Sequence, residues 1–284
     1  MGIENEQVRG INLKVVRVPG WDRFPWLRHG FSTRRGGVST VYGGEALNLG
    51  WTKEDDPAAV SENRRRFLRL VEGEQGGSVM VGVRQIHSGV VRVVRESDGA
   101  LEGGLQSPEG KAVLEGDGLI TAVPGVLLAV GTADCVPILV VDVEKRVVAA
   151  FHAGWRGTVA RIVEQGIAKI AAEYGARVED MVAAVGPSIG ACCYTVGDEV
   201  RSEFGGQFGY AEELFRQMDG EMRLNLWEAN RRQLVDAGIG AGRIAVVGEC
   251  TACSQEENGT LRYFSHRGEK GVAGRMLNVV GIVA

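Results

Sequence analysis

The chain has 284 residues, of which 44% are hydrophobic and 24% are charged, and its formal net charge is −4. This composition is typical of a globular protein and excludes a chain that is disordered throughout. The slight acidity excludes binding to nucleic acid or to an anionic membrane through bulk charge. Glycine, with 42 residues, is about twice as frequent as in an average protein, which favours a site built from loops.

The sequence also predicts where the protein resides and how it is organised. It contains no run of about 18 apolar residues, and residues 1–6 lack the basic start of a secretory signal. We therefore expect a cytoplasmic protein whose five cysteines are thiols rather than disulfides. We expect one domain over residues 1–284, with an N-terminal extension at 1–26 and a mobile loop at 97–116.

Local patterns predict a mixture of strands and helices. The apolar runs between residues 119 and 151 lack polar alternation, which indicates strands buried on both faces. Because strands and helices do not alternate regularly, we predict an α+β fold with mixed β-sheets flanked by helices. Strands are predicted at 27–32, 79–84, 90–94, 119–121, 126–130, 137–141, 147–151, 181–185, 244–247 and 261–264, and helices at 56–71, 154–174, 211–218 and 226–237.

Three candidate metal ligands lie at or near the ends of predicted strands: His87, Cys135 and His152. Two histidines and a cysteine leave the fourth tetrahedral position open, which is the arrangement expected of catalytic zinc. From the residues alone, two alternatives stay open. The histidines can be turn residues and Cys135 a small buried side chain, or Cys135 can be a thiolate nucleophile with a histidine as its base.

Charged residues beside these positions are further candidates. Asp134 either fixes the loop backbone or orients an imidazole. Arg34 stands before a glycine turn, and Arg156 stands at the start of the predicted helix 154–174, so both are candidate anion ligands. The alternative is that both arginines are simply solvated.

The remaining cysteines occur as two close pairs. Cys250 and Cys253 have the spacing of metal ligands, but the sequence offers no comparable second pair to complete a set of four. We interpret them as ordinary thiols. Cys192 and Cys193 are interpreted as buried thiols in a turn.

Several motifs occur together and in order, and together they carry a family resemblance. They include residues 29–39 (HGFSTRRGGVS), 84–87 (RQIH), 132–137 (TADCVP), 152–157 (HAGWRG) and 186–194 (GPSIGACCY). The chain resembles the YfiH / laccase-domain family, also called peptidoglycan editing factor and multicopper polyphenol oxidoreductase, from about residue 27 to the C-terminus.

The resemblance implies a YfiH-like fold, with zinc bound by His87, Cys135 and His152 as catalytic residues. It also implies phosphorolysis of purine nucleosides (adenosine, inosine, guanosine, methylthioadenosine) to base and ribose 1-phosphate, with adenosine deamination as a second activity. Copper is the alternative metal. The expected partners are a purine nucleoside and phosphate, with neither nucleic acid nor membrane, and the expected oligomeric state is a monomer or homodimer.

Phosphorolysis needs an anion site, for which Arg34 and Arg156 are the candidates. Asn48 and Gln85 are candidates for hydrogen bonds to ribose or base. Two other activities stay open at this point. One is copper-dependent polyphenol oxidation, for which four histidines are few. The other is a cysteine hydrolase that edits peptidoglycan precursors through Cys135.

Overall fold

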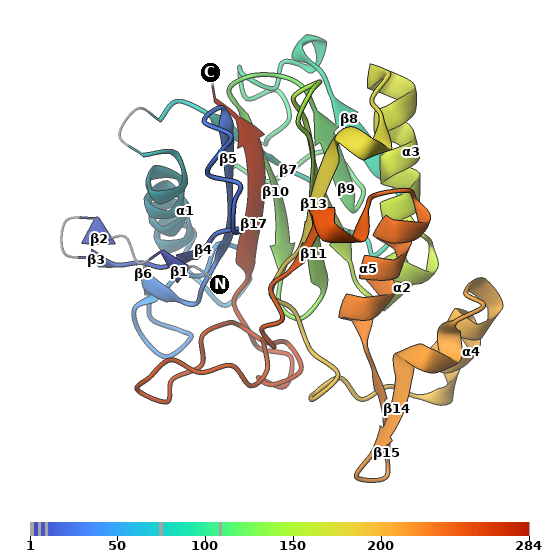
Figure 1. The fold of residues 1–284 in the computed structure, drawn as a ribbon. Coiled ribbons are helices and arrows are strands. Elements are labelled where there is room, and N and C mark those ends of the chain that lie inside the picture. Colours follow the sequence, from blue (N-terminus) through green and yellow to red (C-terminus); the bar gives the residue numbers. More distant parts are fainter. Residues whose placement is uncertain (1–2, 5–6, 9–10, 74–75, 108–109, 284) are drawn as a thin grey trace.

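Two β-sheets pack face to face, and helices cover both outer faces (Figure 1). The structure is a computed structural model that describes residues 3–4, 7–8, 11–73, 76–107 and 110–283. The α+β class with mixed sheets flanked by helices is confirmed, because each large sheet contains both parallel and antiparallel pairs.

The first sheet has six strands, with β17 near its centre between β5 and β10. β17 is absent from the predicted strands, although all seven of its residues are buried. The predicted strand at 261–264 is wrong, because this segment is irregular, with bends at residues 262–263 and a single isolated bridge at Leu261. In spatial order the strands are β1 (Ile3–Glu4), β4 (Val15–Val16), β5 (Leu27–Ser32), β17 (Met276–Ile282), β10 (Val126–Thr132) and β7 (Val79–Gly82).

The second sheet contains the apolar runs that the sequence assigned to doubly buried strands. That prediction is confirmed, since every residue of its two central strands is buried. In spatial order the strands are β16 (Ile244–Val246), β13 (Met181–Val185), β11 (Val136–Asp142), β12 (Val147–Ala153), β9 (Gly118–Thr121) and β8 (Val91–Val94).

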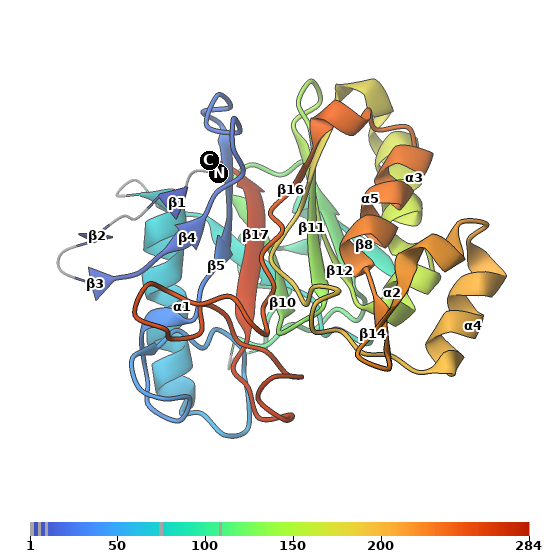
Figure 2. The same ribbon diagram turned by 60° about the horizontal axis from the view of Figure 1, so that its bottom comes forward.

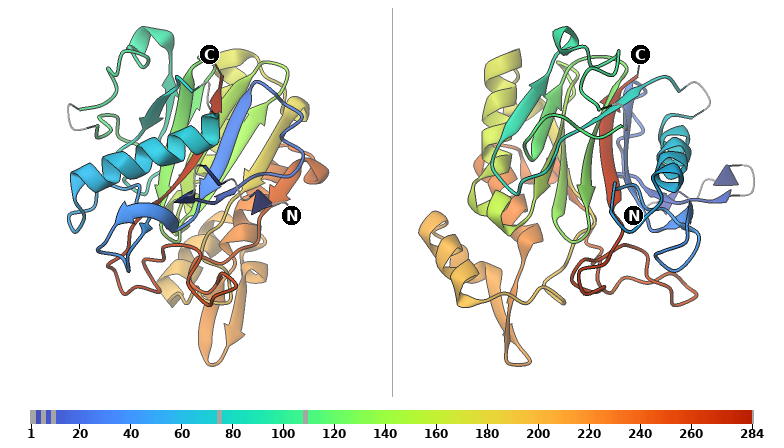
Figure 3. Two further views of the ribbon diagram at one scale, coloured as in Figure 1. Left: turned by 90° about the vertical axis from the view of Figure 1, so that its left-hand side faces the viewer. Right: turned by 180° about the vertical axis from the view of Figure 1, so that it is seen from behind.

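Helices complete the layers (Figures 2 and 3). α1 (Pro57–Glu72), capped by the Asp56 side chain, packs on the first sheet. α2 (Trp155–Val159), α3 (Ile162–Tyr174) and α5 (Leu226–Asp236) pack on the second sheet. Short 3₁₀ helices span Glu96–Asp98, Val178–Asp180, Ala211–Leu214 and Ala241–Arg243.

The single helix predicted at 154–174 is wrong, because α2 and α3 are separated at Arg161. Arg161 has φ +55°, in the left-handed region, and ends the helical path. The carbonyls of Thr158 and Ala160 accept hydrogen bonds from the side chains of Gln233 and Gln165. Side-chain donors thus bind carbonyls at the break.

The helix predicted at 211–218 is also wrong. After a short 3₁₀ helix the chain forms a hairpin of β14 (Phe215–Met218) and β15 (Glu221–Leu224). Its two turn residues, Asp219 and Gly220, have φ values of +53° and +78°. An Asp-Gly turn with two positive φ values is a strong hairpin signal, and it outweighs local helix propensity. The helix α4 (Asp198–Gln207), before this hairpin, was not predicted.

Two further short strand regions lie outside the large sheets: β6 (Arg35–Ser39), and the pair β2 (Gln7–Val8) and β3 (Ile11–Asn12). The segment 97–116 connects β8 to β9, but residues 108–109 lie outside the described residues, and its mobility stays a prediction. Among the described residues, none of the helices combines the length and the apolar character needed to cross a membrane.

The chain passes from one sheet to the other at two places that position the site. The segment after β7 leads to β8 in the second sheet, and the short loop of residues 133–135 leads from β10 to β11. Both crossings carry residues that line one cavity. The core between the sheets is formed by inward-facing side chains such as Phe31, Leu128 and Leu139.

Candidate active site

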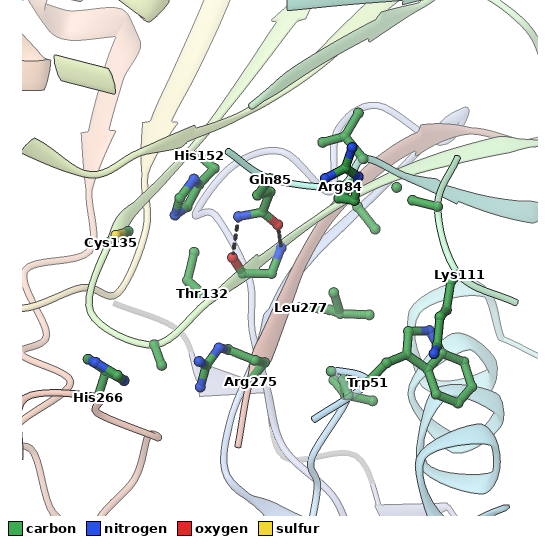
Figure 4. Close-up of a pocket in the computed structure, with 18 of the residues that line it drawn as sticks. Trp51, Arg84, Gln85, Lys111, Thr132, Cys135, His152, His266, Arg275 and Leu277 are labelled. Carbon is green, nitrogen blue, oxygen red and sulfur yellow. Dashed lines mark hydrogen bonds between the residues drawn. The ribbon is translucent and has the colours of Figure 1, made fainter. Parts of the chain in front are cut away.

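A cavity of about 710 Å³ lies at the crossings between the sheets. Cys135, His152 and His266 lie toward one end, and Trp51 and Lys111 lie toward the other (Figure 4). We call the first of these the donor end. A cavity of this volume is within the range of small-molecule sites.

Three side chains converge at the donor end. One nitrogen of His87, one nitrogen of His152 and the Cys135 sulfur all lie within 4.8 Å of one another. The two imidazole rings meet edge to face, with centroids 5.0 Å apart. Imidazole and thiolate are ligands of zinc and copper, so this donor set fits a metal ion with a remaining open position.

Asp117 orients two of these three residues. Its Oδ1 lies 2.9 Å from Nδ1 of His152, which leaves the other ring nitrogen for a ligand. The same carboxylate accepts hydrogen bonds from the backbone N–H groups of His87 (3.0 Å) and Ser88 (2.6 Å). These bonds hold His87 in its left-handed conformation, with φ +58°. A carboxylate behind a metal-binding histidine fixes the tautomer and the direction of the ring.

Charges at the donor end shift three pKa values. Burial raises the pKa of Cys135, but His152 and His87 outweigh it and lower this pKa to about 6. Burial lowers the pKa of His152, but the Cys135 thiolate and Asp117 outweigh it and raise this pKa to about 9. For Asp117, burial is again the largest influence and is outweighed by His152 and Ser88, which lower the pKa to about 2. A metal ion that binds here must therefore displace a proton from His152.

Asp134 fixes the loop backbone and does not orient an imidazole. Its carboxylate accepts hydrogen bonds from the Thr251 hydroxyl (2.7 Å) and from the backbone N–H of Arg267 (2.7 Å). Its φ of +95° turns the chain sharply just before Cys135. The residue that orients His152 is instead Asp117, which the sequence analysis did not single out.

Of the four predicted substrate-binding residues, the structure places only Gln85 in the cavity lining. The Gln85 amide exchanges two 2.8 Å hydrogen bonds with the backbone of Gly131, so it ties the segment after β7 to β10 just before the second crossing (Figure 4). Asn48 is fully buried and bonds to Asp55 and to the backbone N–H of Arg275.

The two predicted anion-binding arginines also lie outside this lining. Arg34 forms a 2.8 Å ion pair with Glu269 and stacks on Phe264. Arg156 stacks on Trp155 and lines a separate, open hollow on the outside of α2. Cations that do line the cavity are Arg64, Arg84, Lys111, Arg267 and Arg275. The sequence analysis did not single them out: Arg84 stands in the motif 84–87, but the cavity that these five cations share is formed by segments far apart along the chain.

The two cysteine pairs meet. Sγ atoms of Cys192, Cys193, Cys250 and Cys253 all lie within 4.8 Å of one another, and we call these residues the cysteine cluster. The interpretation of Cys192 and Cys193 as buried thiols is wrong for Cys192, which is exposed, and Cys193 is half-buried. Cys192 and Cys193 are therefore the second pair that the sequence analysis did not find, and they lie 57 residues or more before Cys250 and Cys253 along the chain.

Comparisons with known proteins place the chain in a family. The family model described as "Multi-copper polyphenol oxidoreductase laccase" matches residues 28–283. The chain belongs to this laccase-like family. The resemblance inferred from the motifs is therefore confirmed.

Relatives in the laccase-like family carry enzyme names. A purine nucleoside phosphorylase of Deinococcus radiodurans is 38% identical over 255 residues, which cover 89% of this chain and 88% of that protein. The adenosine deaminase RL5 of an unknown prokaryotic organism is 38% identical over 226 residues, covering 78% of this chain and 84% of that protein.

A solved structure of the laccase-like family has the same fold. The crystal structure of the Bacillus licheniformis hypothetical protein YfiH is similar with a TM-score of 0.81 and 31% identity, covering 95% of this chain and 96% of that one. The YfiH-like fold is thereby confirmed.

Proposed function

We propose that the chain is a zinc-dependent purine nucleoside phosphorylase with adenosine deamination as a second activity. It would convert adenosine, inosine or guanosine and phosphate into the base and ribose 1-phosphate, and methylthioadenosine and phosphate into adenine and 5-methylthioribose 1-phosphate. The observation that carries this proposal is the convergence of His87, Cys135 and His152 at one end of a cavity lined by cations. The names of the relatives support it.

The cavity offers positive charge to phosphate. In phosphorolysis a phosphate oxygen forms a bond to ribose C1′ while the bond from C1′ to the base breaks, and the base leaves with the electron pair and takes up a proton. The phosphate therefore needs cations close to the nucleoside. We assign this role to Arg275 and Lys111, which line the cavity, because Arg34 is paired with Glu269 and Arg156 lies elsewhere.

The metal centre would be held by the three converging side chains. A zinc ion there would supply a Lewis acid that polarises a substrate atom, with copper as the alternative ion for the same donors. Asp117 would keep His152 in the orientation that presents its free ring nitrogen. Gln85 would hold the end of β10 at Gly131 in register with the loop that carries His87.

Metal analysis combined with a nucleoside assay tests this proposal. Purified protein is incubated with adenosine, with and without phosphate, and adenine is separated from inosine. We expect adenine and ribose 1-phosphate only with phosphate. We expect inosine in both conditions, with part of it converted to hypoxanthine when phosphate is present. If copper-loaded protein instead oxidises phenols with enzyme-like turnover and leaves adenosine intact, the polyphenol oxidoreductase is the correct alternative.

Replacing Cys135 tests the ligand assignment. We expect Cys135→Ala to lose the zinc of this centre and both nucleoside activities, while the variant and the parent chain, both freed of metal, melt at the same temperature. Ala133→Ser, in the same loop, is the control for perturbation of the crossing. Full phosphorolysis by Cys135→Ala would show that the assignment of ligands is wrong.

A further inference from the structure

We propose that the cysteine cluster binds one structural zinc ion, in a second metal site next to the cavity. The four sulfur atoms come from two turns that are far apart in the sequence. This site is separate from His87, Cys135 and His152, and the proposal does not depend on the reaction catalysed there.

Distances between the sulfur atoms fit a single ion. All four lie within 4.8 Å of one another, and the sulfurs of Cys192 and Cys253 are 3.6 Å apart. Zinc–sulfur bonds of about 2.3 Å in a tetrahedron place the sulfurs about 3.8 Å apart. The four thiols therefore need only small side-chain adjustments to surround one ion. Four thiolates with no open position are typical of a structural zinc site.

Backbone hydrogen bonds hold each pair in place. The N–H groups of Cys193 and Tyr194 donate to the carbonyl of Gly190, which closes the first turn. The N–H of Ser254 donates to the carbonyl of Cys250 at 2.9 Å and closes the second turn. Both turns are thus formed by the chain itself, and the donors are already gathered for an ion.

Further bonds hold the two turns side by side. Ser188, just before the first turn, forms a parallel bridge with Cys250 and accepts a hydrogen bond from the N–H of Thr251 (3.1 Å). The N–H of Gly190 lies 3.3 Å from the Cys250 sulfur and donates to it. An N–H donor to a ligand sulfur is a contact that stabilises the thiolate form.

Burial and charge also suit a zinc–thiolate site. Cys250 is buried, whereas Cys192 and Cys253 are exposed and give an ion a path from solvent. Four thiolates at this spacing repel one another strongly, and a divalent cation removes that repulsion. Arg223 donates to the carbonyl of Cys192, so a positive side chain lies beside a site whose net charge with zinc would be −2.

The cluster is connected to the candidate active site. Thr251, between the two ligands of the second turn, donates to the Asp134 carboxylate beside Cys135. The N–H of Ile189 donates to the Asp134 carbonyl at 2.9 Å. Tyr194, which follows Cys193, lines the cavity. Zinc at the cluster would therefore fix the loop that positions Cys135 and one wall of the cavity.

The test uses the full chain with the site of His87, Cys135 and His152, which we call the first centre, disabled by a substitution of Cys135. In Cys135→Ala, we expect one zinc per chain after metal loading. X-ray absorption at the zinc edge should show four sulfur atoms at about 2.3 Å. Absence of zinc from this variant, nitrogen or oxygen atoms in the shell, or a disulfide between Cys192 and Cys253 in reduced preparations would each overturn the proposal.

Two substitutions at one exposed ligand give the matched comparison, both in the Cys135→Ala background. We expect Cys253→Ser to weaken zinc binding at least 100-fold. We expect Cys253→His to keep an ion, and its cobalt-loaded form to show absorption bands shifted to higher energy with a weaker sulfur charge-transfer band. Unchanged zinc affinity in Cys253→Ser, or an unchanged cobalt spectrum in Cys253→His, would exclude Cys253 as a ligand and overturn the four-cysteine site.

Discussion

Asp117 joins two donors that are 65 residues apart along the chain. It meets the ring of His152 and the backbone N–H groups on either side of the His87 α-carbon, and it is fully buried. One carboxylate therefore sets both a ring direction and a loop conformation. A neutral amide at this position would place N–H against N–H.

We expect Asp117→Asn to lower zinc affinity at the first centre 10- to 100-fold, because the histidine loses its orienting carboxylate. Competition with a chromogenic chelator measures this affinity. Asp142→Asn is the matched control, since Asp142 is equally buried and also accepts backbone N–H groups in a turn. Equal affinities in the two variants would show that Asp117 has no influence on the ion.

The lowered pKa of Cys135 predicts its reactivity in metal-free protein. Because its pKa lies at about 6 rather than at 9.0, the thiol is ionised above pH 6, and protonation suppresses the thiolate below it. We expect alkylation of Cys135 by iodoacetamide, followed by peptide mass spectrometry, to increase with pH with a midpoint near 6. The denatured chain is the control. The same midpoint in folded and denatured chains would contradict the coupling to His152 and His87.

Local sequence predicted which side chains converge, and the geometry explains why this was possible. His87 and His152 follow or end apolar runs, so their position at strand ends could be inferred from hydrophobic patterning alone. The role of Asp117 and the proximity of Cys192 to Cys250 could not be inferred from hydrophobic patterning. They depend on which loops meet, and such contacts between distant segments leave no periodic signal in the sequence.

At the scale of elements, the junction of β12 and α2 touches the first centre. A Cβ atom added at Gly154 would lie 2.8 Å from the Cys135 sulfur and 3.6 Å from Cδ2 of His87. The φ of Gly154 is −68°, so alanine is compatible with the backbone there, and the close approach alone accounts for the glycine.

We therefore expect Gly154→Ala to displace the Cys135 sulfur and to reduce metal occupancy and nucleoside turnover about tenfold. The free energy of unfolding should change by no more than about 2 kcal/mol. Gly205→Ala in α4 is the control, because nothing lies within 4 Å of its added Cβ. Metal content and thermal melting are measured on both. Full occupancy in Gly154→Ala would mean that the thiol has room to move.

Element prediction succeeded where apolar runs were long and failed where a turn decided the outcome. The strands predicted between residues 27 and 185 all occur, with ends shifted by at most two residues. The hairpin of β14 and β15 was mistaken for a helix, although Asp219 and Gly220 carry its signal. β17 was missed although its run of apolar residues indicates a strand. The signal was present in the sequence and was overlooked.

At the scale of the molecule, a buried histidine in the first sheet couples stability to pH. His29 in β5 is 5% exposed and accepts a 2.9 Å hydrogen bond from the N–H of Val18. Burial, and then the charge of Arg17, lower its pKa from 6.5 to about 3. The folded protein thus keeps His29 neutral while the unfolded chain takes up a proton below pH 6.5.

This difference stabilises the fold above pH 6.5, and the stabilisation is lost as pH falls toward 3. We expect about 1.4 kcal/mol of stability to be lost per pH unit across this window from His29. Urea denaturation at pH 4 to 7 measures it, and His29→Gln should remove this part of the slope. His266→Gln, at an exposed position, is the control. Parallel slopes in the parent chain and His29→Gln would rule out His29 as the cause.

The two ends of the cavity come from different parts of the chain. His87 and Cys135 lie on the crossings between the sheets and His152 lies in β12, whereas Trp51 and Lys111 at the other end belong to loops that carry none of these three donors. Those loops can change in length or composition without moving the three metal-type donors. In evolution, the choice of small molecule can therefore drift while the His87, Cys135 and His152 donor set is inherited intact.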